Sequence, residues 1–105
     1  MTGPTGGGGV ADWTFQDDPD VAVLTTRSIV RDGAPVVHVS HDADDGSWQF
    51  HDGTPGTPRE EDALVVSLRS MVLRDGTLNE LADLSEGWRA WRDGPAAPWK
   101  RTRIG

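Results

Sequence analysis

The sequence contains no cysteine and no tyrosine, and only 35% of its residues are apolar. Without cysteine the chain can form neither a disulfide nor a thiolate, which excludes cysteine-ligated zinc, iron–sulfur clusters and cysteine nucleophiles. No apolar run approaches the roughly 18 residues that a membrane-spanning helix needs. No charged-then-apolar leader opens the chain. We therefore expect a cytoplasmic protein that does not contact a membrane.

The 105 residues suffice for one domain with a small core. Five tryptophans supply much of the apolar bulk, so we expect their rings to dominate the energetics of the core. Residues 1–9 include five glycines and predict a disordered leader. Residues 10–94 are expected to form a single domain, and residues 95–105 a basic C-terminal tail anchored by Trp99 alone.

Two segments of alternating apolar and polar residues, 35–41 and 47–53, flank an Asp-Gly-containing turn and predict a β-hairpin. Side chains alternate between the faces of a strand. The apolar side chains therefore share one face only if the numbers of paired residues sum to an odd value, as for Val39 opposite Phe50 or Ala43 opposite Trp48. That apolar face comprises Val37, Val39, Trp48 and Phe50, and the other face comprises His38, Ser40, Gln49 and His51.

A sheet with one apolar and one polar face is typical of antiparallel sheets that are covered on one side. We therefore predict an α+β fold, an antiparallel sheet built on the central hairpin with short helices packed on one face. The other predicted elements are a buried strand at 21–25, a short helix at 27–31 that Thr26 caps and Gly33 ends, an amphipathic turn at 78–84 and a closing strand at 87–92.

Residues 58–74 allow two interpretations. Thr57–Glu60 fits a capping box, and the apolar spacing that follows is compatible with one helix to Arg74. Leu64–Val66 is equally compatible with a short strand, after which Ser67 would cap a new helix. We favour the strand followed by the helix.

Four stretches of the chain form one further pattern: Val23–Ile29, the hairpin corner Asp45–Phe50, Ser67–Met71 with Asp75, and Leu84–Arg92. In these stretches the chain resembles an uncharacterised bacterial family related to immunity protein 33, whose members pair with polymorphic toxins. The resemblance covers about two-thirds of the chain and implies an α+β fold without an established catalytic residue. It also implies a toxin as the kind of partner to expect.

Three histidines and four aspartates around the hairpin are the densest group of potential metal ligands in the sequence: His38, His41, His51, Asp42, Asp44, Asp45 and Asp52. His38 and His41 are three residues apart on a strand and so point to opposite faces. His38 and His51 are able to meet across the hairpin, but a metal site would need a third ligand. We therefore favour a solvated polar face and expect no bound metal.

Two further patterns suggest ligand loops, and neither is complete. Asp42–Gly46 resembles the start of a calcium loop, but the chain turns apolar at Ser47–Phe50 where further ligands would be needed. Gly6–Gly9 lacks the Lys-Ser or Lys-Thr pair and the preceding strand of a phosphate loop. We interpret the first as a turn and the second as a linker.

The C-terminal segment alternates rings with cations, a pattern that single-stranded nucleic-acid surfaces use. It comprises Trp88, Arg89, Trp91, Arg92, Trp99, Lys100, Arg101 and Arg103. Alternation along the strand places Trp88 with Ala90 on one face and Arg89 with Trp91 on the other, so at least one ring should pack into the core. The net charge of −7 also disfavours nucleic acid as a partner.

We expect a non-catalytic protein-binding module without a cofactor, immunity-like in its most specific form. Its partner would present a basic surface to the acidic residues Asp12, Asp17, Asp18, Asp20, Asp42, Asp44 and Asp45. The alternatives are a metal-assisted enzyme that uses His38, His51 and a neighbouring aspartate, and a structural or regulatory subunit. No motif in the sequence places a nucleophilic serine or threonine beside a residue that could act as its general base.

Overall fold

The computed structural model describes residues 13–54 and 59–104 of the chain. The expected leader over 1–9, the domain start at residue 10, Asp12 and the first two residues of the expected capping box, Thr57 and Pro58, lie outside these described residues.

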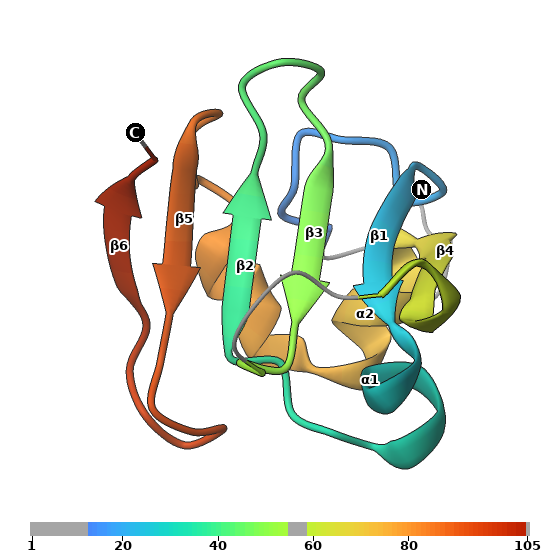
Figure 1. Ribbon diagram of the computed structural model, residues 1–105. Helices are drawn as coiled ribbons and strands as arrows, with labels where there is room; N and C mark the ends of the chain where they lie inside the picture. The colour runs from blue at the N-terminus through green and yellow to red at the C-terminus, as the bar shows by residue number, and fades with distance from the viewer. Residues whose placement is uncertain (1–12, 55–58, 105) are drawn as a thin grey trace, which may run out of the picture.

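The chain folds as an α+β structure around a six-stranded sheet of order β4-β1-β3-β2-β5-β6 (Figure 1). The strands are β1 (Ala22–Thr26), β2 (His38–His41), β3 (Trp48–His51), β4 (Ala63–Ser67), β5 (Trp88–Trp91) and β6 (Lys100–Arg103). Neighbouring strands are antiparallel except for β1 and β3, which are parallel. The predicted fold class and the central hairpin are confirmed. The parallel pair was not foreseen, and it arises because the chain leaves β1, adds β2 further along the sheet and then returns as β3 between them.

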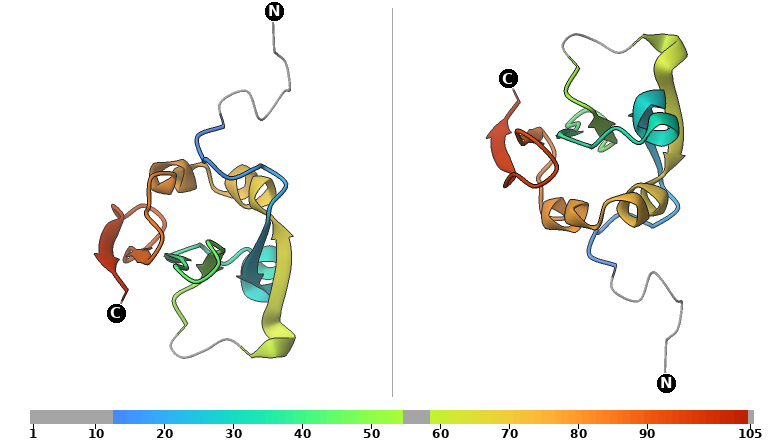
Figure 2. Two further views of the ribbon diagram at one scale, coloured as in Figure 1. Left: turned by 90° about the horizontal axis from the view of Figure 1, so that it is seen from above. Right: turned by 90° about the horizontal axis from the view of Figure 1, so that it is seen from below.

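Two of the short helices, α2 and η3, cover one face of this sheet (Figure 2). The helices are α1 (Arg27–Asp32), α2 (Leu68–Arg74) and two 3-10 turns, η2 (Glu60–Asp62) and η3 (Gly76–Leu81). The side chain of Ser67 accepts a hydrogen bond from the Ser70 amide, so the predicted strand followed by a capped helix is confirmed. Gly33 ends α1 with a φ of 75°, a left-handed conformation that glycine adopts without steric cost.

No helix in the described part of the chain has the length and apolar character needed to cross a membrane.

The hairpin register has the predicted parity, since Val39 lies opposite Phe50 and Ser40 opposite Gln49. Trp48 pairs with His41 rather than with Ala43, so the second pairing that we suggested is wrong. The predicted position of Val37 on the apolar face is also wrong. It precedes β2, is half-buried and lines the polar face, whereas Val36 is 2% exposed and enters the core in its place. The strict alternation fails there because the regular strand begins only at His38.

The core lies between the sheet and the helices and is built around Trp48 and Phe50, which are 1% and 0% exposed. Phe15 packs edge-on against Trp48 at 5.2 Å between ring centroids, and the His41 ring stacks on the same indole at 3.9 Å. The helical side contributes Ile29, Leu68, Met71, Leu78, Leu81 and Leu84. Trp13 packs against this core as well, and the predicted amphipathic turn at 78–84 is confirmed.

The buried cation Arg92 joins several connections of the fold. Its side chain is 1% exposed and forms a 2.7 Å ion pair with Asp75. The guanidinium also donates to the carbonyls of Val36 and Pro95 and to the hydroxyl of Thr77. It lies 4.1 Å from the centre of the Trp99 ring. The start of β2, the η3 turn and the loop before β6 are thus held together at one point.

The C-terminal segment is more ordered than we predicted. Lys100–Arg103 forms β6, which pairs with β5 along its whole length, so the expected tail anchored by Trp99 alone is wrong. The strand was missed because Lys and Arg favour strands weakly and no apolar alternation marks this segment. Its pairing comes from the neighbouring β5. The sheet therefore continues beyond residue 94, and Trp88–Trp91 is not its last strand.

The burial of Trp48 predicts that Trp48→Ala will lower the free energy of unfolding by roughly 3–5 kcal/mol, because the change removes an indole from a packed core. The matched change on the other face of β3, Gln49→Ala, should cost about 2 kcal/mol or less, since it removes two side-chain hydrogen bonds, to Asp42 and to His51. Urea denaturation of both variants measures the difference. A larger loss for Gln49→Ala would contradict the observed register.

Candidate functional site

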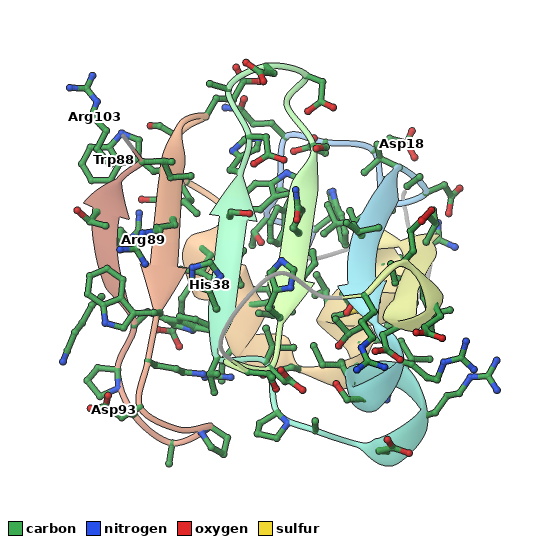
Figure 3. All side chains as sticks on the ribbon, in the orientation of Figure 1. Asp18, His38, Trp88, Arg89, Asp93 and Arg103 are labelled. Carbon is green, nitrogen blue, oxygen red and sulfur yellow. The ribbon has the colours of Figure 1, made fainter. Side chains whose placement is uncertain are left out.

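The face of the sheet opposite α2 and η3, which we call the open face, holds a hollow of about 960 Å³. Residues from β2, β3 and β5 form its floor: His38, Ser40, Gln49, His51, Arg89 and Trp91. The segments before β2 and after β3 and β5 form its rim, with Pro35, Val37, Thr54 and Asp93 among them. Figure 3 shows His38 and Arg89 on the neighbouring strands β2 and β5.

His38 and His51 lie directly opposite each other on the hairpin, with 5.8 Å between their ring centroids. Burial lowers the pKa of His38 below the usual histidine value, and the charges of His51 and Arg89 lower it further. Burial also lowers the pKa of His51, although the nearby carboxylates of Asp52 and Asp42 act in the opposite direction. Both imidazoles are therefore biased towards the neutral form, which is the form that binds metals.

The carboxylates near this pair are already engaged. Asp42 accepts hydrogen bonds from Gln49 at 2.7 Å and from the Ser47 hydroxyl at 3.2 Å. Asp52 accepts from the Ser28 hydroxyl at 2.6 Å and from the Thr54 amide at 2.9 Å. These bonds, the one from Ser28 most strongly, lower the pKa of Asp52. Within residues 13–54 and 59–104, no group of three potential ligands is placed to hold a metal ion.

His41 lies on the other face of the hairpin, as predicted, and its role is in packing. Its Nδ1 atom is 2.7 Å from the Leu84 carbonyl, which can only accept, so that nitrogen carries the proton. The Asp42–Gly46 segment is a turn, as predicted. Asp45 accepts a hydrogen bond from the Ser47 amide, and Gly46 adopts a φ of 72°.

The residues of the predicted ring-and-cation cluster separate onto the two sides of the sheet. Arg89 lies over the Trp91 ring at 5.1 Å on the open face, and the register places Lys100 opposite Trp91. The other members point away from this surface or are buried. Trp88 and Trp99 pack against the core, Arg92 is buried, and Arg101 forms a 2.8 Å ion pair with Asp83. The continuous stacking surface that single-stranded nucleic acid would use is therefore divided.

The two acidic segments that the sequence singled out meet at one end of the sheet, which we call the acidic end. Asp18 and Asp20 precede β1, and Asp42, Asp44 and Asp45 connect β2 to β3, which runs parallel to β1. Figure 3 shows Asp18 at this end. Asp17 links the two segments, since its Oδ1 atom accepts a 3.1 Å hydrogen bond from the Trp48 indole. Glu86, just before β5, lies at the same end.

The sequence predicted which residues share the floor of the hollow, but it did not predict most of the residues that form the rim. Strand alternation placed His38, Ser40, Gln49 and His51 on one face, and the structure confirms it. Thr54, Asp93 and Pro95 reach the hollow from loops, and no periodic pattern in the sequence signals where a loop will lie. Two of the acidic residues are also engaged within the chain, since Asp17 and Asp42 accept hydrogen bonds from side chains of β3.

Comparison with known proteins found no match to this chain among family models, curated proteins or solved structures.

The lowered pKa values of His38 and His51 predict how stability depends on pH. The unfolded chain takes up protons near the ordinary histidine pKa of about 6.5, whereas the folded chain does so only at lower pH. Stability from these groups is therefore fully present above that value and is lost as the pH falls through the folded pKa values. Urea denaturation at about pH 7.5 and about pH 5.5 should show lower stability in acid. The double change His38→Gln with His51→Gln should remove most of the difference, and its full persistence in that variant would contradict this origin.

Proposed function

We propose that this chain is a non-catalytic protein-binding module, immunity-like in its most specific form, whose partner lies over the open face and presents a basic surface to the acidic end. The observation that carries the proposal is the position of the hollow. It lies on the side of the sheet away from α2 and η3, on the same hairpin whose turn contributes to the acidic end.

The side chains of the open face are suited to protein contact. Trp91 is half-buried and lies under Arg89, and tryptophan and arginine are the residue types that most often dominate binding energy at interfaces. Towards the other side of the sheet, Val65 is 69% exposed and lies in register with Leu24. The open face therefore offers a ring and a cation at one side and aliphatic side chains at the other.

The acidic end supports a basic partner through long-range attraction. Charge of one sign on a surface accelerates the encounter with a partner of opposite sign, and the effect weakens as salt concentration rises. The carboxylates of Asp44 and Glu86 are not used in hydrogen bonds with the rest of the described chain, and both residues are exposed. They are therefore the members of the acidic end that are best suited to steering.

The test begins with a partner isolated from the native host on the wild-type chain. Asp44→Asn combined with Glu86→Gln should slow association several-fold and reduce its dependence on salt, because rim charges act mainly on the association rate. A matched control, Glu60→Gln with Glu61→Gln, removes the same charge from η2, which lies at the other end of the sheet, and should change association less. Surface plasmon resonance at low and high salt measures both rates.

The contact surface is tested separately with Trp91→Ala, which should speed dissociation at least about tenfold if this ring is a central contact. Thermal unfolding of the variant shows whether it remains folded. A partner that binds wild type, Trp91→Ala and the acidic-end variant with equal rates would contradict the proposal.

A metal-assisted enzyme is the second candidate, and the direct opposition of His38 and His51 is the observation that favours it. Two neutral imidazoles on facing strands supply half of a tetrahedral ligand set. Any remaining ligands would come from the substrate, from solvent or from rearranged side chains.

For the binding module we expect no metal-dependent rise in melting temperature with nickel, zinc or manganese. A one-site ligand at 100 times its dissociation constant would stabilise the fold by about 2.7 kcal/mol, which a thermal scan detects. Isothermal calorimetry gives the stoichiometry. A rise of several degrees with one metal that disappears in His51→Ala would favour the enzyme, and the matched change His41→Ala would show whether the loss is specific to the open face.

A further inference from the structure

The two edges of the sheet differ in chemistry. β6 carries Lys100, Arg101 and Arg103, and charged side chains on an edge strand prevent another strand from adding to it. β4, at the other edge, has the sequence ALVVS and no charged residue. Val65 at its centre is 69% exposed. β4 is therefore an apolar edge strand without the usual protection.

The backbone of β4 leaves a defined set of groups unpaired. The Leu68 amide donates to the Val21 carbonyl, and hydrogen-bonded pairs alternate along an antiparallel ladder. The backbone of Leu64 and Val66 therefore points towards β1, and that of Ala63, Val65 and Ser67 points outwards.

Two of the outward groups are used locally. The Ala63 amide donates to the Glu60 carbonyl, and the Ser70 hydroxyl donates to the Ser67 carbonyl at 2.7 Å. Four outward groups then remain without a partner in the described part of the chain: the amide and carbonyl of Val65, the amide of Ser67 and the carbonyl of Ala63.

These four groups are complementary to themselves, and we propose that β4 pairs antiparallel with β4 of a second copy of this chain across a two-fold axis at Val65. In this arrangement each Val65 amide donates to the Val65 carbonyl of the other copy. Each Ser67 amide donates to the Ala63 carbonyl of the other copy. All eight unpaired groups of the two strands find partners, and none of the groups already used locally is needed.

The charges that flank β4 fit the same register. The residues before the strand are the acidic η2 turn, Glu60–Asp62, and Arg69 follows it at the start of α2. Antiparallel pairing about Val65 places the η2 turn of each copy beside the start of α2 of the other. The side chains of Glu61 and Arg69 are 72% and 42% exposed, and their present ion pairs, with Arg59 and Asp20, are on the surface. A parallel pairing would instead bring the two acidic turns together.

The interface is small. Stable complexes bury about 1,200–2,000 Å² in total, and a pair of five-residue strands covers less than this. The dimer should therefore be weak and depend on concentration. It would join the two sheets into one, with both open faces on the same side, because side chains that lie opposite each other in neighbouring strands share a face.

Sedimentation equilibrium over a wide concentration range tests the association, and amide hydrogen exchange tests its geometry. The mass should rise from 11.3 kDa towards twice that value. Over the same range the amides of Val65 and Ser67 should become protected. A chain that stays monomeric at the highest concentration, or a dimer in which these two amides exchange freely, would overturn the proposal.

Three variants sharpen the test. Val65→Lys places two like charges opposite each other at the axis and should weaken the dimer at least about tenfold. The control Ile104→Lys introduces the same charge at a residue that is 43% exposed and directly follows β6, the other edge strand, and it should leave the dimer unchanged. Equal effects of the two would overturn the proposal.

Val65→Pro removes the donor of both central hydrogen bonds, and proline is tolerated on an edge strand where the amide faces solvent. This variant should remain folded and be monomeric. A folded dimer would show that the association lies elsewhere and would overturn the proposal. If proline unfolds the chain, the comparison of Val65→Lys with Ile104→Lys decides the outcome.

Discussion

The loops of this fold are held in position by the hydrogen bonds of one buried group, the guanidinium of Arg92. A charge in the interior is costly unless every donor finds an acceptor, and here all five N–H groups do so. Burial would raise the pKa of Asp75, but hydrogen bonds from Thr77 and Arg92 outweigh it and lower the pKa. The ion pair is thereby kept charged, and the loops that supply its acceptors are held in place.

The same constraint shapes the candidate site. Arg92 lines the hollow of the open face as well as bonding to Val36 and Pro95, so the start of β2 and the loop after β5 are fixed relative to each other at its rim. The floor depends on a different feature, the register of three neighbouring strands. If the open face binds a partner as proposed, a floor and a rim that are already positioned would reduce the ordering cost of binding.

The charges are separated in space as well as in sequence. The acidic end gathers the carboxylates that precede β1 and those of the hairpin turn, while Arg89 and Lys100 lie towards the β5–β6 side. A partner over the open face would therefore meet carboxylates at one end and cations at one side. This uneven distribution would fix its orientation more than its affinity, because charge complementarity acts chiefly on specificity and encounter. The net charge of the chain, −7, does not reveal this separation of the acidic end from Arg89 and Lys100.

Much of the fold was predictable from local patterns. The parity of the hairpin, the cap at Ser67 and the end of α1 at Gly33 all depend on residues close together in the chain. Part of the site followed as well, since alternation placed His38 and His51 on one face. The misplacement of Val37 marks the limit of this reasoning, because alternation holds only where the strand is regular.

The sequence by itself determined which segments form strands and helices in the centre of the chain, and which side chains share a face, because these depend on side-chain periodicity and local hydrogen bonds. Only the tertiary structure decided that β3 runs parallel to β1, that Lys100–Arg103 is a strand and that Arg92 is buried. In each case the stabilising partner lies far away in the chain. The acceptors of Arg92, the ladder offered by β5 and the space between β1 and β2 exist only once the rest of the molecule has folded.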